Sequence, residues 1–248
     1  MGHLHRVSKY VFSSDKSPRL TRLGSAEWSR TKEKVTVATQ ELAEEIINLH
    51  TERQQVEGIS YPSDSLWEQE LSDSFEFEET PDQEDAIESV KLDMMSTSIM
   101  DRLICGDVGY GKTEVAVRAA FKAVTNGKQV AILVPTTVLA QQHYQTLAER
   151  LSPYPIKVDV ISRLRSKPEQ KAITESLAAG EIDICVGTHR LLQRDIEFSN
   201  LGLVIVDEEQ RFGVAQKERV KKLSDKVDVL TLSATPVSYT HLTLPTSD

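Results

Sequence analysis

The chain has 248 residues, of which 39% are hydrophobic and 27% charged, a balance typical of one large globular domain or of a domain with an extension. No apolar run approaches the roughly 20 residues that a membrane-spanning helix needs, and the start lacks a secretory signal core, so we expect a cytoplasmic protein with no membrane partner. The net charge of −9 arises from residues 41–100, with 17 acidic and 2 basic side chains, and it neither indicates nor excludes a nucleic-acid partner.

The first predicted element is a long helix over residues 25–56, because apolar side chains recur there at every seventh position and no proline interrupts them. The members of this apolar stripe are Trp28, Val35, Leu42, Leu49 and Val56. So narrow a stripe fits one docking surface, either on the protein's own domain, which we favour, or on a partner. Residues 57–80 are acidic and contain serine and proline, and we interpret them as a linker anchored by Phe75 and Phe77.

A helix-start pattern follows at Thr80-Pro81-Asp82-Gln83. Threonine at the N-cap, proline at the first helical position and glutamine at the third form a capping box, which needs no ligand. The alternative is that the Gln83 amide reads the edge of an adenine base. The spacing alone leaves both interpretations open.

A glycine-rich turn lies between the apolar run Leu103–Cys105 and a helical segment that begins near residue 113. Its residues are Gly106, Asp107, Val108, Gly109, Tyr110, Gly111, Lys112 and Thr113. The backbone N–H groups of such a turn wrap a polyphosphate, and the dipole of the following helix adds to the attraction. Lys112 is then expected to reach the β- and γ-phosphates, and the Thr113 hydroxyl to ligate Mg²⁺. The turn therefore predicts a site for ATP and Mg²⁺.

From this turn onward, short apolar runs alternate with helical stretches. Strands are expected at 103–105, 129–134, 157–161, 182–186, 203–206 and 229–232, and helices near 113–125, 137–151, 168–179 and 214–223. Several of the strands are continuous runs of Val, Ile and Leu, which is typical of a parallel sheet covered on both faces, and Cys105 and Cys185 within them are interpreted as core residues. The pattern predicts an α/β fold, a RecA-like doubly wound parallel sheet of the P-loop NTPase kind, with ligands at the carboxyl ends of the strands.

The apolar run Leu203–Val206 ends in the polar sequence Asp207-Glu208-Glu209-Gln210. In a P-loop protein, one acid at this place holds the Mg²⁺ shell, and the next orients and deprotonates the attacking water. We assign Asp207 to the metal and Glu208 to the base. Lys112, Asp207 and Glu208 are thus the candidate catalytic residues of an ATP hydrolase.

Three further polar turns follow strands. Ser233-Ala234-Thr235 lies where a second domain would meet this one, and we expect it, with Glu209 and Gln210, to couple the γ-phosphate site to that interface. Pro135-Thr136-Thr137 and Gly187-Thr188-His189-Arg190 present small hydroxyls and N–H groups at helix starts, which suit the backbone of a nucleic acid. The same groups serve as helix caps without any ligand. His189 has no partner at metal-ligand spacing, so no metal site is expected there.

In this order, these segments resemble the superfamily 2 helicases and translocases, and among them the transcription-repair coupling factors. The resemblance covers residues 5–236, and five stretches carry it beyond the general motifs. These are Gly106–Ala116, Val134–Thr137, Leu139–Tyr144, Gly187–Leu192 and Asp207–Val214. It implies that Gln83 recognises adenine. It also implies that two stretches face double-stranded DNA and contact mainly its backbone. These are residues 134–144, including Gln141, and residues 187–192.

The resemblance also implies a domain organisation. Residues 1–24 would be the end of an RNA-polymerase-interacting domain, residues 25–80 a long helix and acidic linker, and residues 81–236 the first RecA-like motor domain. The implied activity is ATP-driven translocation on DNA that acts on a stalled RNA polymerase, with RNA polymerase and nucleotide-excision-repair proteins as partners. Residues 237–248 depart from the family pattern, and we interpret them as a non-native tail.

We expect only the first of two motor domains in this chain, without the arginine finger of the second, and therefore a monomer that binds ATP and DNA with little turnover. RecG-like fork-remodelling helicases, which share Asp207–Gly213, are the alternative family. Tyr110, Pro135-Thr136-Thr137 and the long helix favour the coupling factors. The chain by itself is alternatively a nucleotide-binding module without turnover, and DNA-stimulated ATP hydrolysis would separate these classes.

Overall fold

The computed structural model describes residues 58–224 and 226–234 continuously, together with six isolated positions nearer the start. These are Ala26, Trp28, Arg30, Glu33, Thr36 and Val37, and all six are helical. The chain divides into two compact units, residues 1–51 and residues 52–248, and the elements below all belong to the second. The apolar stripe beyond Trp28 and the predicted tail at 237–248 lie outside the described residues.

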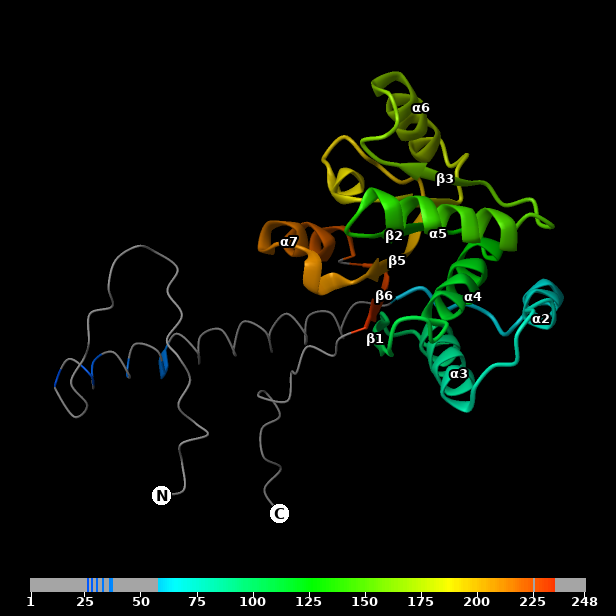
Figure 1. Cartoon of the computed structure of the whole chain (residues 1–248), viewed down its shortest axis with the longest axis horizontal. Coiled ribbons are helices and arrows are strands. Elements are labelled where there is room, and N and C mark those ends of the chain that lie inside the picture. The colour runs from blue at the N-terminus through cyan, green and yellow to red at the C-terminus, as the bar shows by residue number, and fades with distance from the viewer. Residues whose placement is uncertain are drawn as a thin grey trace, which may run out of the picture. The chain divides into compact units, whose positions relative to one another are not determined.

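A six-stranded parallel sheet, in the order β1-β6-β5-β2-β4-β3, forms the centre of the second unit (Figure 1). Its strands are β1 (Asp101–Cys105), β2 (Gln129–Leu133), β3 (Val158–Ile161), β4 (Ile184–Gly187), β5 (Leu201–Asp207) and β6 (Asp228–Ser233). The four inner strands are buried along almost their whole length, which explains their continuous apolar sequences. All six carboxyl ends therefore lie at one edge of the sheet.

Helices cover both faces of this sheet. They are α3 (Pro81–Met95), α4 (Lys112–Thr125), α5 (Thr137–Arg150), α6 (Lys167–Ala178) and α7 (Val214–Leu223), with short 3₁₀ helices η2 (His189–Leu192) and η3 (Glu209–Arg211). One apolar core packs alternate strand residues against α3, α4 and α5, and the other packs the intervening ones against α6, η2 and α7. In Figure 1, α6 and β3 occupy one end of this unit, and α3 and β1 the other.

The predicted RecA-like α/β fold is confirmed, and each strand and helix expected between residues 103 and 232 is present, with both ends within two residues of the prediction. The prediction for one cysteine is wrong. Cys185 of β4 is buried as expected, whereas Cys105 is exposed. Its strand, β1, lies at one edge of the six-stranded sheet and alternates between exposed and half-buried side chains.

A helix that the sequence had not revealed, α2 (Leu66–Asp73), lies within residues 57–80. It begins at Ser65, whose hydroxyl accepts a hydrogen bond from the Glu68 N–H while the Glu68 carboxylate accepts one from the Ser65 N–H. Leu71 on this helix is 1% exposed and belongs to the core formed with α3 and α4. The stretch interpreted as a linker is therefore packed on the domain.

An ion-pair cluster fastens the same segment to the domain. The ammonium of Lys122, on α4, is 2% exposed and lies 2.9 Å from Asp64 Oδ1 and 3.5 Å from Glu68 Oε1. Lys91, on α3, lies 2.5 Å from Asp64 Oδ2. Although partial burial opposes it, the hydrogen bonds from Lys91 and Lys122 hold the pKa of Asp64 below its ordinary value.

We expect Leu71→Ala to lower the free energy of unfolding by about 2–5 kcal/mol, because it removes a fully buried leucine and leaves a cavity under α2. Leu66→Ala is the matched control, since Leu66 is 75% exposed on the same helix and its truncation should change stability by less than about 0.5 kcal/mol. Urea unfolding of the two variants measures the difference. Equal stabilities would show that α2 does not pack on the core.

Candidate active site

The phosphate-binding turn joins the carboxyl end of β1 to the start of α4. Gly109 and Gly111 have φ angles of +87° and +70°, in the left-handed region that favours glycine. At Gly111, the N-cap of α4, a Cβ atom would also meet the amide of Gln83. Both glycines are therefore needed for the turn that brings residues 106–111 to the N-terminus of α4, where anions are favoured.

Lys112 lies over this turn. Its ammonium donates hydrogen bonds to the carbonyl oxygens of Gly106 and Asp107, at 2.5 Å and 2.8 Å. Thr113 follows in the first turn of α4. Lys112 and Thr113 thus both lie at the start of α4, beside the glycine-rich turn, and their roles towards the phosphates and the metal stay predictions.

Gln83 forms the expected capping box and also contacts the phosphate turn, while its role towards adenine stays a prediction. Its Oε1 accepts a hydrogen bond from the Thr80 N–H at 2.9 Å, and Thr80 Oγ1 accepts one from the Gln83 N–H at 3.3 Å, so the capping box is present. Its Nε2 donates to the Tyr110 carbonyl in the phosphate turn at 2.8 Å. One N–H and one lone pair of the amide remain, which is the pattern that binds the N6/N7 edge of adenine.

Asp207 and Glu208 stand at the carboxyl end of β5. Asp207 Oδ2 lies 2.9 Å from Nε2 of His143, a largely buried residue of α5. Glu208 has φ +54° and ψ +48° and is the one residue other than glycine with positive φ within 58–224 and 226–234. Such strain persists where the surroundings hold the backbone firmly, as at functional sites.

The Glu208 carboxylate is held from the neighbouring strand β6. Its Oε1 accepts a hydrogen bond from the Ala234 N–H at 3.2 Å, and its Oε2 accepts one from the Gln210 amide. The Gln210 carbonyl in turn accepts one from the Ser233 hydroxyl at 3.2 Å. The acidic turn and the turn after β6 thus form one hydrogen-bonded network, and the coupling to a second domain stays a prediction.

The other two predicted coupling residues are not part of this described network. Glu209 Oε1 lies 3.1 Å from the ammonium of Lys217 on α7, outside the lining of the cleft formed by the acidic and phosphate turns. Thr235 lies beyond the described residues.

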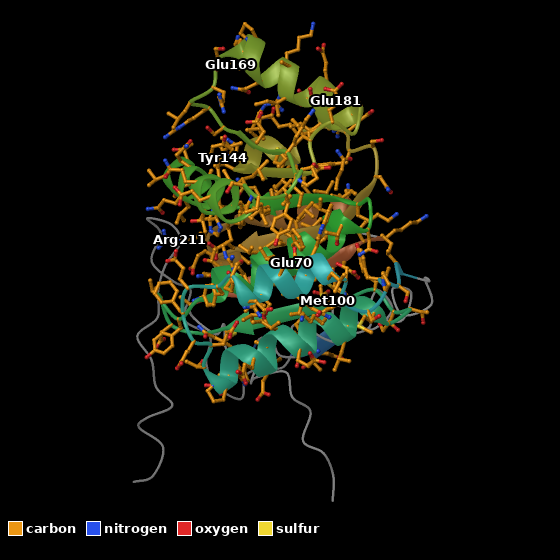
Figure 2. All side chains as sticks on the ribbon, turned by 90° about the vertical axis from the view of Figure 1, so that its right-hand side faces the viewer. Glu70, Met100, Tyr144, Glu169, Glu181 and Arg211 are labelled. Atoms are coloured by element: carbon orange, nitrogen blue, oxygen red, sulfur yellow. The ribbon has the colours of Figure 1, made fainter. Side chains whose placement is uncertain are left out.

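A cleft of about 870 Å³ unites the phosphate turn with the acidic turn. Its walls include Lys112, Thr113, His143, Asp207, Glu208 and Ala234. The two turns are close because β6 lies between β1 and β5: the Gly106 N–H donates to the Ser233 carbonyl at 3.1 Å, and the Glu208 N–H to the Leu232 carbonyl at 2.9 Å. Many of the lining residues follow the carboxyl ends of β1, β5 and β6, so the cleft lies at that edge of the sheet, and Figure 2 labels one of them, Arg211, to the left of Met100, which precedes β1.

A second cavity, of about 790 Å³, adjoins the first and shares Gly109, Gly111 and Thr113 with it. Gln83, Phe75 and Phe77 also line it. The rings of Phe75 and Phe77 pack edge to face at 5.6 Å, and Phe77 is 70% exposed. The two cavities together offer a polar compartment beside the phosphate turn and an aromatic one beside Gln83.

The first group of predicted DNA contacts stands at the start of α5. Thr136 caps this helix, its hydroxyl accepting a hydrogen bond from the Leu139 N–H at 3.2 Å, and it is exposed, as is Gln141. Pro135 and Thr137 are half-buried. Exposed hydroxyl and amide groups at a helix start are available to a phosphate backbone.

The second group is less accessible. Gly187 and Thr188 are buried, and only His189 is exposed. The Arg190 guanidinium donates to both carboxylate oxygens of Asp195 at 2.8 Å and 2.7 Å, and to Gln170 Oε1 at 2.9 Å. These hydrogen bonds hold the pKa of Asp195 below its ordinary value, which keeps the pair charged. This group therefore offers fewer free donors than its sequence suggested.

Sequence reasoning did not identify His143 or Arg211 as residues of the cleft. His143 stands on the buried face of α5 between Ala140 and Leu147, where its spacing resembles that of an ordinary core residue. Its contact with Asp207 spans 64 positions of the chain and follows no local pattern. The signal that could have identified His143 is its polar side chain at a core-facing position of a helix that was already predicted to bind a ligand.

A parallel α/β sheet with a phosphate-binding turn after one strand and paired acids after a nearby strand defines a nucleotide-binding domain of the P-loop class. The model of the DEAD/DEAH box helicase family matches residues 80–242, and the chain belongs to that family.

The particular relatives are coupling factors. The chain is 54% identical over 242 residues to the transcription-repair-coupling factor of Staphylococcus aureus strain USA300, and 53% identical to that of Staphylococcus epidermidis. Each alignment covers 97% of this chain and 21% of the relative, so the chain spans about a fifth of their length. A solved structure, RecG bound to a three-way DNA junction, superimposes with a TM-score of 0.67 at 38% identity, over 76% of this chain and 25% of that one.

Two absences apply to the described part of the chain. Within it, no helix is long and apolar enough to cross a membrane. Nor do three or more His, Cys, Asp or Glu side chains gather there into a site that could hold a metal ion by themselves. A Mg²⁺ ion bound with one carboxylate, a hydroxyl and phosphate oxygens needs no such cluster, and Asp207 and Thr113 on the walls of one cleft fit that donor set.

Proposed function

We propose that the chain is the first motor domain of an ATP-driven DNA translocase of transcription-coupled repair. The observation that carries the proposal is the cleft, which brings Lys112 and Thr113 of one turn together with Asp207 and Glu208 of another. The identity to coupling factors supports the biological setting.

Residues of the phosphate turn bind and orient ATP in this proposal. The N–H groups at the start of α4 receive the phosphates, the Lys112 ammonium exchanges its two carbonyl partners for phosphate oxygens, and Gln83 receives the base. Asp207 and Thr113 would hold Mg²⁺. The ion held there would supply positive charge against the negative charge that develops on the phosphate oxygens.

Glu208 is the residue placed to take the proton of the attacking water. Hydrogen bonds from Ala234 and Gln210 leave its carboxylate fixed at the mouth of the cleft. The same bonds tie it to the turn after β6, so a shift of that turn would displace the base. This is the route by which a second domain would control hydrolysis.

The surface at the start of α5, defined by Thr136 and Gln141, is the proposed contact with the DNA backbone.

We further propose the domain organisation expected from the sequence, with residues 1–24 and 25–80 preceding the motor domain at 81–236, and with RNA polymerase as a target of the longer protein. The alternative is that the chain by itself acts as a nucleotide-binding module without turnover.

A chimaera tests this function. Residues 1–234 would replace the matching segment of the Staphylococcus aureus coupling factor, and the expected result is ATP-dependent release of a stalled RNA polymerase from duplex DNA. Translocation is measured separately by displacement of a third strand from the duplex. A folded chimaera that binds ATP but moves along no DNA would overturn the proposal.

The RecG likeness supports a second candidate, a fork-remodelling helicase. Three-way junctions should then stimulate ATP hydrolysis by the chimaera more than linear duplexes of the same length do. Equal stimulation by the two DNAs would favour the translocase.

Gln83→Ala is expected to reduce the preference for ATP over GTP by about 1–3 kcal/mol, because a bidentate amide contact to adenine is lost. Thr80→Ala is the matched control, since it removes the hydroxyl from the capping box and leaves the amide in place. Competition of the two nucleotides for binding to each variant gives the measurement. If both variants keep the wild-type preference, Gln83 serves only the helix cap and the phosphate turn.

A further inference from the structure

We propose that His143 is a positioning residue that holds the Asp207 carboxylate for Mg²⁺. The inference rests on the proposed function, because it takes Asp207 as the metal-binding acid. The observation behind it is the 2.9 Å contact between His143 Nε2 and Asp207 Oδ2 within the cleft.

Within the described residues, the His143 side chain on helix α5 makes its hydrogen bond to Asp207. His143 is 8% exposed, and Ala140 and Leu147, one turn away on either side of it along the helix, are 0% and 1% exposed. The imidazole thus projects from a face that otherwise packs on the apolar core. A polar ring on such a face requires a partner for its N–H group.

The contact leaves one oxygen of the carboxylate available. An N–H donated to Oδ2 fixes the rotation of the Asp207 side chain, and Oδ1 is then free to face the compartment that Thr113 also lines. Groups that hydrogen-bond a metal-ligating carboxylate orient it, and their removal typically lowers metal affinity or activity by about 10–100-fold. His143 would act on the metal through Asp207, without touching ATP or the reacting water.

A purely structural role makes a different prediction. If the contact only satisfies two polar groups near the core, then its removal lowers stability and leaves the metal affinity of the folded protein unchanged. Metal affinity, measured on folded protein, therefore separates the two roles.

The experiment is a Mg²⁺ titration of ATP binding to the whole chain, compared with binding in EDTA. In His143→Leu, the Mg²⁺ concentration that half-saturates the effect should rise about 10–100-fold, while the metal-free affinity for ATP stays unchanged. His143→Gln, whose amide N–H can occupy the place of Nε2, should restore most of the loss. His143→Asn has a side chain too short to reach Asp207, so it should not restore the Mg²⁺ affinity. This variant replaces His143→Leu in the comparison if the leucine variant fails to fold.

Gln145→Leu is the matched control, because it makes the same kind of change on the exposed side of α5. Asp207→Asn separates the inference from the proposed function. A weakened Mg²⁺ effect in Asp207→Asn with a normal one in His143→Leu and His143→Asn would overturn the positioning role and leave the function standing. A normal effect in all of these variants would overturn the assignment of Asp207 itself.

Discussion

Mg-ATP at about 100 times its dissociation constant is expected to stabilise this chain by about 2.7 kcal/mol, and Lys112→Ala is expected to abolish that gain. The reason is geometric: the Lys112 ammonium lies over the phosphate turn, within hydrogen-bond distance of the Gly106 and Asp107 carbonyls, where the phosphates are expected. For a domain of this size, the gain corresponds to a rise in melting temperature of roughly 5–10 °C.

Thermal unfolding with and without Mg-ATP measures the effect, and each variant is compared with its own ligand-free melting temperature. This comparison removes any change in intrinsic stability from the lost hydrogen bonds of Lys112. Lys171→Ala is the control, because Lys171 is an exposed lysine of α6 whose ammonium pairs with Glu175 at 3.6 Å. A wild-type shift in Lys112→Ala would show that the phosphates do not bind at this turn.

Slow ATP hydrolysis is the second expected result. The described residues form one RecA-like domain, and an arginine finger supplied by a second domain is worth on the order of 10³–10⁵ in rate. The chain alone should therefore turn over slowly even with DNA, and joining it to the second motor domain of the Staphylococcus aureus relative should restore DNA-stimulated hydrolysis.

In that joined protein, Glu208→Gln should lower the turnover rate by about 10²–10⁴-fold, because the variant cannot accept the proton of the attacking water. ATP binding should persist, since the amide keeps the size of the side chain. Glu218→Gln, an exposed acid of α7, is the matched control and should hydrolyse ATP normally. Rapid hydrolysis by Glu208→Gln would mean that the catalytic base lies elsewhere, and rapid hydrolysis by the chain alone would mean that no arginine finger from a second domain is needed.

Local chemistry explains why the phosphate turn could be predicted. Its glycines at 109 and 111 occupy a backbone region that other residues avoid, and the apolar strand before it and the helix after it each have their own sequence pattern. The carboxyl end of β5 was predictable for the same reason, because a buried strand that ends in acids is visible in the sequence. The capping box at Thr80 and Gln83 depends on neighbours three residues apart.

The helix α2 was not predicted, because its apolar positions are few and its acidic side chains suggested a solvated linker. Tertiary contacts stabilise it: Leu71 fills a space against α3 and α4, and the Lys122 ammonium lies beside the carboxylates of Asp64 and Glu68. The residues of α4 that contact this helix, including Lys122, are about 50 positions away from it in the sequence. The exposure of Cys105 likewise follows from the position of β1 in the order of the strands, which the strand itself does not specify.

The sequence by itself determined the order of strands and helices, the phosphate turn and the identity of the two acids, because each depends on periodicity or on residues within a few positions. Only the tertiary structure decided which residues surround Asp207 and Glu208. His143 on helix α5 contacts Asp207 at the end of strand β5, and Ala234 reaches Glu208 because β6 lies between β1 and β5. It also decided that Arg190 is bound to Asp195 while Thr136 and Gln141 stay exposed. Long-range pairing of strands sets the surroundings of Asp207 and Glu208, and no local pattern records it.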